Sequence, residues 1–504
     1  MDESRMRNGC LLVLALFCGM SCPWTWGQTR SSLRESLAPL VARLPDPRAT
    51  VGVCVLDLQT ATSVYEYNAD GAMIPASTLK LFVMAAGVDV LGADFCFETV
   101  LATDGANLIV VGDGDPAFGD EKIHKARGET ITSVFDRWAD LLIQEGRRHT
   151  SGDLILDESI FDDVRLHPSW DRADHGKWYA AQVSSLNMND NCLDITVRPG
   201  PRPNDACDLS VQPAMGSGKI INQCRSHGKG SPVVNFDPRS NAFVISGRTN
   251  QTWDLGSVAF PDPGLLFADS MRSVWKQHGV SIAGSIRRRR VRSISGGFPE
   301  PIEVIDRHKT PLADVLQRIG KDSQNLFAEC LIKRTGYEWA RRRGLPNPQG
   351  SWPVGAEAVL ETVRRAGLET AGLQVADGSG LSRDNRCTAR QLASILAWMH
   401  RSPHASLFRE SLSVAGNDGS MKKRLHDVRG RVFCKTGTIR GVRSLAGLVE
   451  SVEGRWYAFA VMFNGYKGSS TPYKDIQDRI CRVLVGNAPP APIKKSPAKS
   501  KSRS

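Results

Sequence analysis

The sequence predicts an α+β protein in which a large β-rich insertion interrupts the main domain. Strand-like segments lie near both ends of the chain, at 51–67 and 432–463, and helical segments lie between 311 and 400. From 96 to 299 the pattern changes to short strands and turns. Terminal strands that enclose helices predict one antiparallel sheet flanked by helices and assembled from both ends of the chain. The 504 residues also exceed what one hydrophobic core usually fills.

The N-terminus has the features of a signal peptide over residues 1–27. Arg5 and Arg7 precede an apolar run, 10–20, that is too short to span a membrane. We therefore expect an exported protein of the periplasm or cell envelope. The alternative is a buried N-terminal helix, because Asp2 and Glu3 dilute the positive charge of the segment.

The first part of the main domain, 30–95, predicts a hairpin followed by a helix. Valines alternate with small residues from 51 to 55, and a polar turn leads into a returning strand. The next helix begins at Ser77, and Lys80 lies three residues later. This spacing places a hydroxyl nucleophile and an amine base on one helical face. By itself the Ser-x-x-Lys pattern is a weak signal, because it recurs at Ser226, Ser273, Ser420 and Ser496.

The inserted region, 96–299, is predicted to form one or two lobes, and the sequence leaves this choice open. Its expected strands are 107–111, 154–157, 192–197 and 243–245, and its expected helices are 130–145 and 264–278. The second part of the main domain, 300–488, begins with helices and ends with strands. Its expected helices are 311–320, 326–334, 355–366, 388–400 and 473–485, and its expected strands are 432–437, 444–449 and 456–463.

The charge of the chain indicates which kinds of partner to expect. The net charge is +11, and two basic runs, 287–290 and the tail 489–504, contribute to it. The basic run 494–503 of this tail has too few apolar residues to pack and predicts disorder, with contact to an anionic wall or membrane surface as the functional alternative. Nucleic acid is not an expected partner, because aromatic residues do not interleave with these charges.

Three of the twelve cysteines lie in the leader, which leaves nine in the expected mature chain. An odd number leaves at least one thiol unpaired, and Cys207 and Cys224 lie in a polar, turn-rich region that suits a disulfide. No cluster of cysteine or histidine has the spacing of a metal site, so we expect neither a metal nor a cofactor.

Two further motifs accompany Ser77 and Lys80. Ser323-Gln-Asn325 lies in a short link between two predicted helices, and Lys435-Thr-Gly occurs once, on a predicted strand. Ser185-Leu-Asn187 is a rival to the second motif, but it leads into a strand-like segment. For Ser323 alone, the simpler interpretation is a helix cap.

Together the three motifs resemble those of the class C low-molecular-mass penicillin-binding proteins, the D-alanyl-D-alanine carboxypeptidase/endopeptidase family. The resemblance covers about 35 to 485. It includes Gly112-Asp-Gly-Asp-Pro116, Asp377-Gly-Ser-Gly-Leu-Ser-Arg383, and Ala415-Gly-Asn-Asp-Gly-Ser420 with Arg424. The chain departs from the family in having Gln324 where Asp is common and Ser420 where Thr is frequent. The resemblance implies a serine β-lactamase/DD-peptidase-like domain with a large insertion before the Ser-x-Asn motif.

The resemblance also implies roles for the motif residues. Ser77 would attack the peptide carbonyl with Lys80 as its base, Ser323 would relay a proton to the leaving nitrogen, and Asn325 would hold Lys80 or the substrate amide. Lys435 and Thr436 would bind the terminal carboxylate, and Gly437 would let the substrate lie along the strand. The backbone N–H groups of Ser77 and Thr438 would form the oxyanion hole.

Two more residues are assigned by similarity alone. Asp174 and Arg383 would contact the amine and carboxylate of a diaminopimelate side chain, and the alternative for each is a surface ion pair. The function expected from this resemblance is a serine DD-peptidase of peptidoglycan that penicillin acylates. It removes terminal D-Ala, cleaves cross-links, or does both. The alternatives are a β-lactamase and a catalytically weak wall-binding scaffold. No segment obviously supplies the deacylating glutamate of class A β-lactamases.

Overall fold

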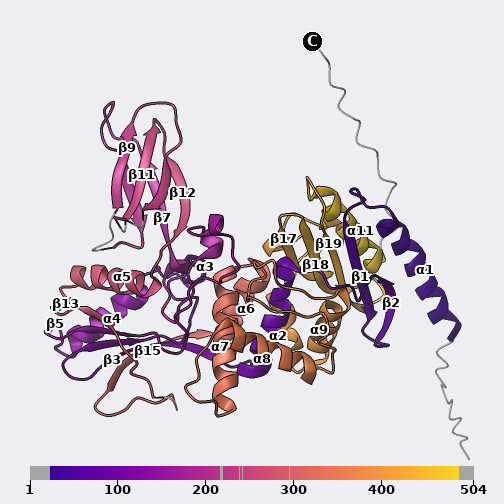
Figure 1. The fold of residues 1–504 in the computed structure, drawn as a ribbon, viewed down its shortest axis with the longest axis horizontal. Coiled ribbons are helices and arrows are strands. Elements are labelled where there is room, and N and C mark those ends of the chain that lie inside the picture. The colour runs from indigo at the N-terminus through magenta and orange to yellow at the C-terminus, as the bar shows by residue number, and fades with distance from the viewer. Residues whose placement is uncertain (1–22, 216–219, 238, 241, 294–295, 487–504) are drawn as a thin grey trace, which may run out of the picture.

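The computed structural model describes residues 23–486, apart from 216–219, 238, 241 and 294–295. Residues 1–22 of the predicted leader and the basic tail, 489–504, lie outside the described residues. The molecule is elongated, with a helix-flanked sheet at one end and the inserted region at the other (Figure 1). Within the described ranges, no helix is both long enough and apolar enough to cross a membrane.

The main domain is built on a six-stranded antiparallel sheet whose strand order is β16-β17-β18-β19-β1-β2. The strands are β1 (Thr50–Asp57), β2 (Thr62–Tyr67), β16 (Ser413–Val414), β17 (Val432–Ile439), β18 (Val442–Glu450) and β19 (Trp456–Asn464). β1 pairs with β19 along its whole length, with Val53 opposite Val461. The predicted union of N- and C-terminal strands in one sheet is therefore confirmed.

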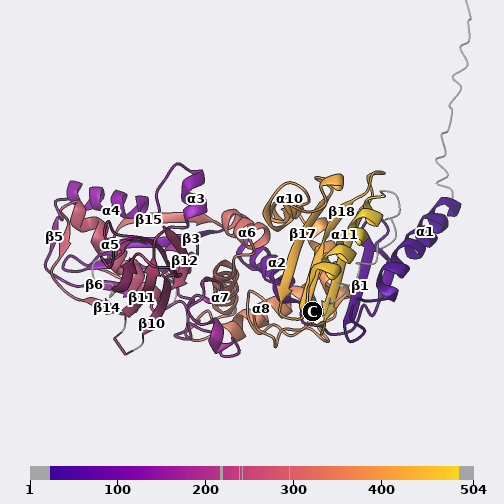
Figure 2. The same ribbon diagram turned by 90° about the horizontal axis from the view of Figure 1, so that it is seen from above.

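Helices cover both faces of this sheet (Figure 2). One face packs against α2 and the helices that follow the insertion: α2 (Lys80–Leu91), α6 (Leu312–Lys321), α7 (Asn325–Arg342), α8 (Trp352–Arg365), α9 (Ala389–Arg401) and α10 (Ala405–Ser411). The other face packs against α1 (Pro23–Ala42) and α11 (Thr471–Val485). Alternate residues of β19 serve the two cores, with Ala460 and Met462 in the first and Phe459 and Val461 in the second.

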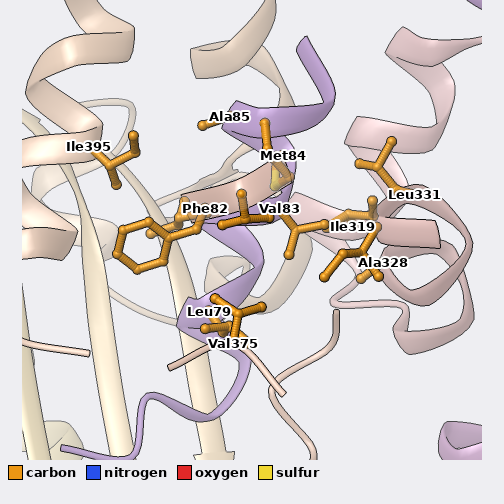
Figure 3. Packing of buried hydrophobic residues seen from close by; sticks show 14 of the residues in the cluster. Leu79, Phe82, Val83, Met84, Ala85, Ile319, Ala328, Leu331, Val375 and Ile395 are labelled. Atoms are coloured by element: carbon orange, nitrogen blue, oxygen red, sulfur yellow. The ribbon is translucent and has the colours of Figure 1, made fainter. Parts of the chain in front are cut away.

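Helix α2 lies at the centre of the main domain. Eleven of its twelve residues are buried, as expected of a helix that is apolar on every side. Phe82 faces Ile395 of α9, and Val83 and Met84 face the helices α6 and α7 (Figure 3). The surrounding helices therefore fix α2, and the residue at its first position, Lys80, is held rigidly.

The inserted region contains a five-stranded sheet of order β14-β6-β4-β3-β15, which is accompanied by smaller sheets. Its strands are β3 (Cys96–Thr103), β4 (Leu108–Val111), β6 (Leu154–Asp157), β14 (Ile286–Arg288) and β15 (Glu303–Pro311). The sheet continues past the predicted end of the insertion at 299, because β15 pairs with β3. The sequence analysis missed this strand.

The rest of the insertion consists of short helices and small sheets that rise above the five-stranded sheet (Figure 1). They are α3 (Glu121–Ala126), α4 (Ser133–Gln144), α5 (Pro263–Gln277), β5 (His149–Thr150), β7 (Cys192–Arg198), β8 (Asp208–Gln212), β9 (Ile220–Ser226), β10 (Val233–Asp237), β11 (Ala242–Thr249), β12 (Trp253–Ala259) and β13 (Ser281–Ile282). One cluster of buried apolar residues extends from the five-stranded sheet into the smaller sheets, from Leu101 through Trp138 to Ile245. A second, smaller cluster that includes Val100 and Ile109 lies on the five-stranded sheet.

Two local expectations in the insertion can be compared with the structure. Cys207 and Cys224 face each other with 3.1 Å between their sulfur atoms, and the disulfide between them stays a prediction. The first residues of the basic run 287–290 belong to an edge strand of the five-stranded sheet. Arg287 and Arg288 lie on or beside β14 and form ion pairs with Asp153 and Glu158.

Candidate active site

Ser77 lies in a short 3₁₀ turn, Ala76–Leu79, and α2 begins only at Lys80. The sequence analysis placed the start of the helix at Ser77 itself. The Nζ atom of Lys80 is 3.2 Å from Ser77 Oγ, so the predicted pair is in contact. Lys80 is fully buried, whereas Ser77 is partly exposed. The hydroxyl faces a cleft of about 1530 Å³, and the amine lies beneath it.

Lys80 makes two shorter contacts with neutral oxygen atoms. Its Nζ donates to Asn325 Oδ1 at 2.7 Å and to the carbonyl oxygen of Ser379 at 2.7 Å. Burial lowers the pKa of Lys80 to about 8, and the nearby carboxylates of Glu329 and Asp377 oppose this shift. A lysine with a lowered pKa has more of the free amine that a general base requires.

Ser323 occupies the link between α6 and α7 in a left-handed conformation, with φ of 61°. Backbone strain of this kind is common at functional sites. Its Oγ accepts a hydrogen bond from Lys435 Nζ at 2.7 Å. The cap of α7 is Gln324, so the helix-cap interpretation does not describe Ser323. The rival Ser185 is buried and does not line the cleft.

Lys435 is fully buried on β17 and is the second ammonium group of the site. Burial lowers its pKa well below the usual range, and the charge of Lys80 lowers it further. The Oγ1 atom of the next residue, Thr436, donates to Ser420 Oγ at 2.9 Å. Lys435, Thr436 and Ser420 therefore place one ammonium and two hydroxyl groups together, a set suited to a carboxylate.

Gly437 is required for a reason that the sequence analysis did not give. A Cβ atom there would lie 3.0 Å from Ser77 N, 2.8 Å from Pro75 O and 2.1 Å from Ser444 Oγ. The glycine therefore lets β17 approach the turn that carries the nucleophile. Thr438, one residue further, is exposed and lines the cleft near Ser77.

Asp174 and Arg383 line the outer part of the same cleft. Asp174 lies at the end of the 3₁₀ turn Arg172–Asp174 of the insertion, and its carboxylate accepts a hydrogen bond from Tyr179 Oη at 2.7 Å. Arg383 donates to the carbonyl oxygen of Arg440 at 3.0 Å. Within the part of the chain that the structure describes, neither residue forms an ion pair.

The sequence analysis missed three contributors to the site. Glu329 lies on α7, one helical turn after Asn325, and holds the loop that carries Ser379. The carbonyl oxygen of Ser379 binds Lys80, and that of Tyr179 accepts a hydrogen bond from Asn325 Nδ2 at 2.7 Å. The insertion, which contains Tyr179, therefore orients Asn325. Only the spacing of Glu329 from Asn325 was visible in the sequence, because backbone carbonyl groups have no sequence signature.

The fold and the site together define a serine hydrolase of the acyl-enzyme class, with a nucleophile, an amine base and a second buried ammonium in one cleft. The chain belongs to the D-Ala-D-Ala carboxypeptidase 3 (S13) family, whose model matches residues 33–485. The family predicted from the three motifs is therefore confirmed.

Individual relatives agree with this assignment. The chain is 30% identical over 481 residues to a D-alanyl-D-alanine carboxypeptidase of Actinomadura sp. (strain R39), an alignment that covers 88% of this chain and 82% of the relative. It is 25% identical over 451 residues to the D-alanyl-D-alanine carboxypeptidase DacB of Haemophilus influenzae, covering 86% of this chain and 88% of the relative. The crystal structure of penicillin binding protein 4 from Haemophilus influenzae has the same fold, with a TM-score of 0.73 and 22% identity over 90% of this chain and 99% of that one.

Proposed function

We propose that the protein is a serine DD-peptidase that hydrolyses the D-Ala-D-Ala bond of peptidoglycan stem peptides through an acyl-enzyme at Ser77. The observation that carries this proposal is the contact of Lys80 Nζ with Ser77 Oγ beside the Lys435–Ser323 pair. Family membership supports the substrate class.

Acylation begins when the free amine of Lys80 takes the proton of the Ser77 hydroxyl. As the proton leaves, Ser77 Oγ forms a bond to the carbonyl carbon, and the carbonyl electron pair moves to the oxygen. The backbone N–H groups of Ser77 and Thr438 hold that oxyanion. The C–N bond then breaks, and the proton passes through Ser323 to the leaving nitrogen, which restores the free amine of Lys80.

The substrate lies along β17 with its terminal carboxylate at Lys435, Thr436 and Ser420. Water then attacks the ester carbon, Lys80 accepts a proton from the water, and the proton returns to Ser77 Oγ as it leaves. Penicillin has a carboxylate and an acylating carbonyl group, and it would enter the same steps at Ser77.

Asp174 and Arg383 form the recognition part of this proposal. Their opposite charges lie in the outer cleft without ion-pair partners among the described residues, and they match the amine and carboxylate at the end of a diaminopimelate side chain. The same cleft has room for a leaving group larger than D-Ala, so we include cleavage of D-Ala-diaminopimelate cross-links in the proposed activity. The predicted leader places this activity in the periplasm or cell envelope, where the basic tail would contact anionic wall or membrane surfaces.

Fluorescent penicillin tests the proposal. We expect persistent labelling of the protein and no labelling of Ser77→Ala. Rapid turnover of penicillin would instead indicate a β-lactamase, and absence of labelling in the unmodified protein would indicate a scaffold. Mass analysis of muropeptides after digestion separates the two peptidase activities, because a carboxypeptidase removes one alanine and an endopeptidase converts dimers to monomers.

A further inference from the structure

Glu329 is a fully buried carboxylate that accepts three hydrogen bonds. The backbone N–H groups of Gly378 and Ser379 donate to it at 2.7 and 2.8 Å, and Trp352 Nε1 donates at 2.7 Å. In the described part of the chain it has no lysine or arginine at ion-pair distance. A buried carboxylate costs free energy, and here two backbone N–H groups and an indole N–H, rather than a cation, compensate for it.

The loop that Glu329 holds is the loop that binds the amine of Lys80. Ser379 donates its N–H to Glu329, and its carbonyl oxygen accepts from Lys80 Nζ at 2.7 Å. The loop then turns at Gly380, where φ is 81° and a Cβ atom would lie 2.0 Å from Ala76 O. The carboxylate therefore fixes a loop that touches both the base and the turn of the nucleophile.

One face of α7 thus holds Lys80 in two ways. Asn325 binds the amine directly, and Glu329, four residues later, binds it through the loop. We propose that Glu329 is a positioning residue for acylation, which orients the amine of Lys80 through Ser379 and stabilises the ammonium that forms when Ser77 loses its proton. This inference rests on the proposed function and adds to it a residue that does not touch substrate.

The charges around Lys80 agree with this role. Glu329 faces it from α7, Asp377 from the loop and Lys435 from β17. The two carboxylates favour the ammonium, whereas burial and Lys435 favour the amine. Burial and the neighbouring Asp377 raise the pKa of Glu329 to about 7. All three hydrogen-bond partners of Glu329 are donors, which favours its ionised form.

The test is the pH profile of kcat/KM for a D-Ala-D-Ala peptide, with the unmodified protein as reference. Glu329→Gln keeps the shape and removes the charge. We expect kcat/KM to fall about tenfold or more and the acid limb to move about one unit to lower pH, because an ammonium without its counter-charge loses its proton more easily. Glu338→Gln, a buried glutamate further along α7 that pairs with Arg341 and Arg342, is the matched control and should leave the limb in place.

An acid limb that stays in place in a folded Glu329→Gln protein would overturn the proposal, whatever the loss of rate. If that variant does not fold, Glu329→Asp replaces it. That variant keeps the charge and shortens the side chain, so the rate should fall while the limb stays at the pH of the unmodified protein. A limb that moves to lower pH in Glu329→Asp would contradict the role. Failure of the proposed function is distinguishable, because the unmodified protein would then release no D-Ala.

Discussion

The floor and the mouth of the cleft hold charge in different ways. On the floor, Lys80 and Lys435 are fully buried, and their hydrogen-bond partners are neutral oxygen atoms. At the mouth, Arg383 is exposed and Asp174 is partly exposed, and each is held by one hydrogen bond. Desolvation changes proton affinity, which the chemistry requires, whereas solvated charges remain available to a charged substrate.

Burial alone does not make a lysine a general base, as a third lysine shows. Lys333 on α7 is also fully buried, but its Nζ forms an ion pair with Asp162 at 2.6 Å and lies 3.9 Å from the ring of Trp352. Burial lowers the pKa of Lys333 as well, but the carboxylate of Asp162 opposes this shift through direct contact. Lys333 touches a carboxylate, whereas the groups that touch Lys80 and Lys435 on the floor of the cleft are neutral.

The largest expected effect is that of Lys80→Met, which removes the base. We expect the rate of penicillin acylation to fall about a thousandfold, while the free energy of unfolding changes by no more than about 1 kcal/mol, because a buried charge and its hydrogen bonds are lost together. Stopped-flow labelling and denaturant melting measure the two quantities.

Lys333→Met is the matched control and should show the reverse pattern. It leaves Asp162 half-buried without its cation, so we expect a loss of about 2 kcal/mol in unfolding free energy and less than about a threefold change in acylation. Equal losses of acylation in the two variants would contradict the assignment of Lys80 as a catalytic lysine and of Lys333 as a structural one.

The next effect is the pH dependence of acylation. The pKa of Lys80 is lowered to about 8, and the free amine is the reactive form, so the rate should rise as the pH increases through about 8. The same lowered pKa makes the contribution of Lys80 to stability more favourable as the pH rises from about 8 toward the ordinary value of about 10.4. A rate that is constant from pH 6 to 9 would contradict the assignment of Lys80 as the base.

Asp174→Ala should have a smaller and selective effect. Loss of a charged hydrogen bond to the diaminopimelate amine predicts about a tenfold lower kcat/KM on diaminopimelate stems, with little change on lysine stems. Asp163→Ala is a control, because Asp163 is an exposed aspartate of the same insertion and does not line the cleft. An identical loss on both kinds of stem would refute the recognition role.

Salt should produce the smallest effect and should act only at the mouth. Raising ionic strength from about 0.01 M to about 1 M shortens the screening length from ~30 Å to ~3 Å. We expect the preference for diaminopimelate stems to fall about threefold and penicillin acylation to change by less than about twofold. A large salt effect on acylation would mean that the floor is more solvated than its geometry indicates.

The predictable part of the molecule was the part with local patterns. Valine alternation located β1, and the apolar run after Lys80 located α2. β15 was missed because it is an edge strand with charged residues, among them Arg307 and Lys309, which pair with Glu98. Its sequence has no alternating apolar pattern.

The site could be predicted only where a side chain belongs to a motif. The Ser77–Lys80 spacing is local, and the Lys435 motif occurs once. The contacts that tune Lys80 join residues about 300 positions apart, as between Lys80 and Ser379, and use a backbone oxygen. Such contacts depend on how α2, α7 and the loop pack together, which no single segment encodes.

The pairing of β1 with β19 has a consequence for biosynthesis. The nucleophile is translated early, but its sheet lacks the strand that joins its N- and C-terminal parts until residue 464 has been made, because β19 lies between β18 and β1. The ammonium of Lys435 also arrives more than 350 residues after Ser77. We therefore expect a chain that ends before residue 464 to lack hydrolytic activity.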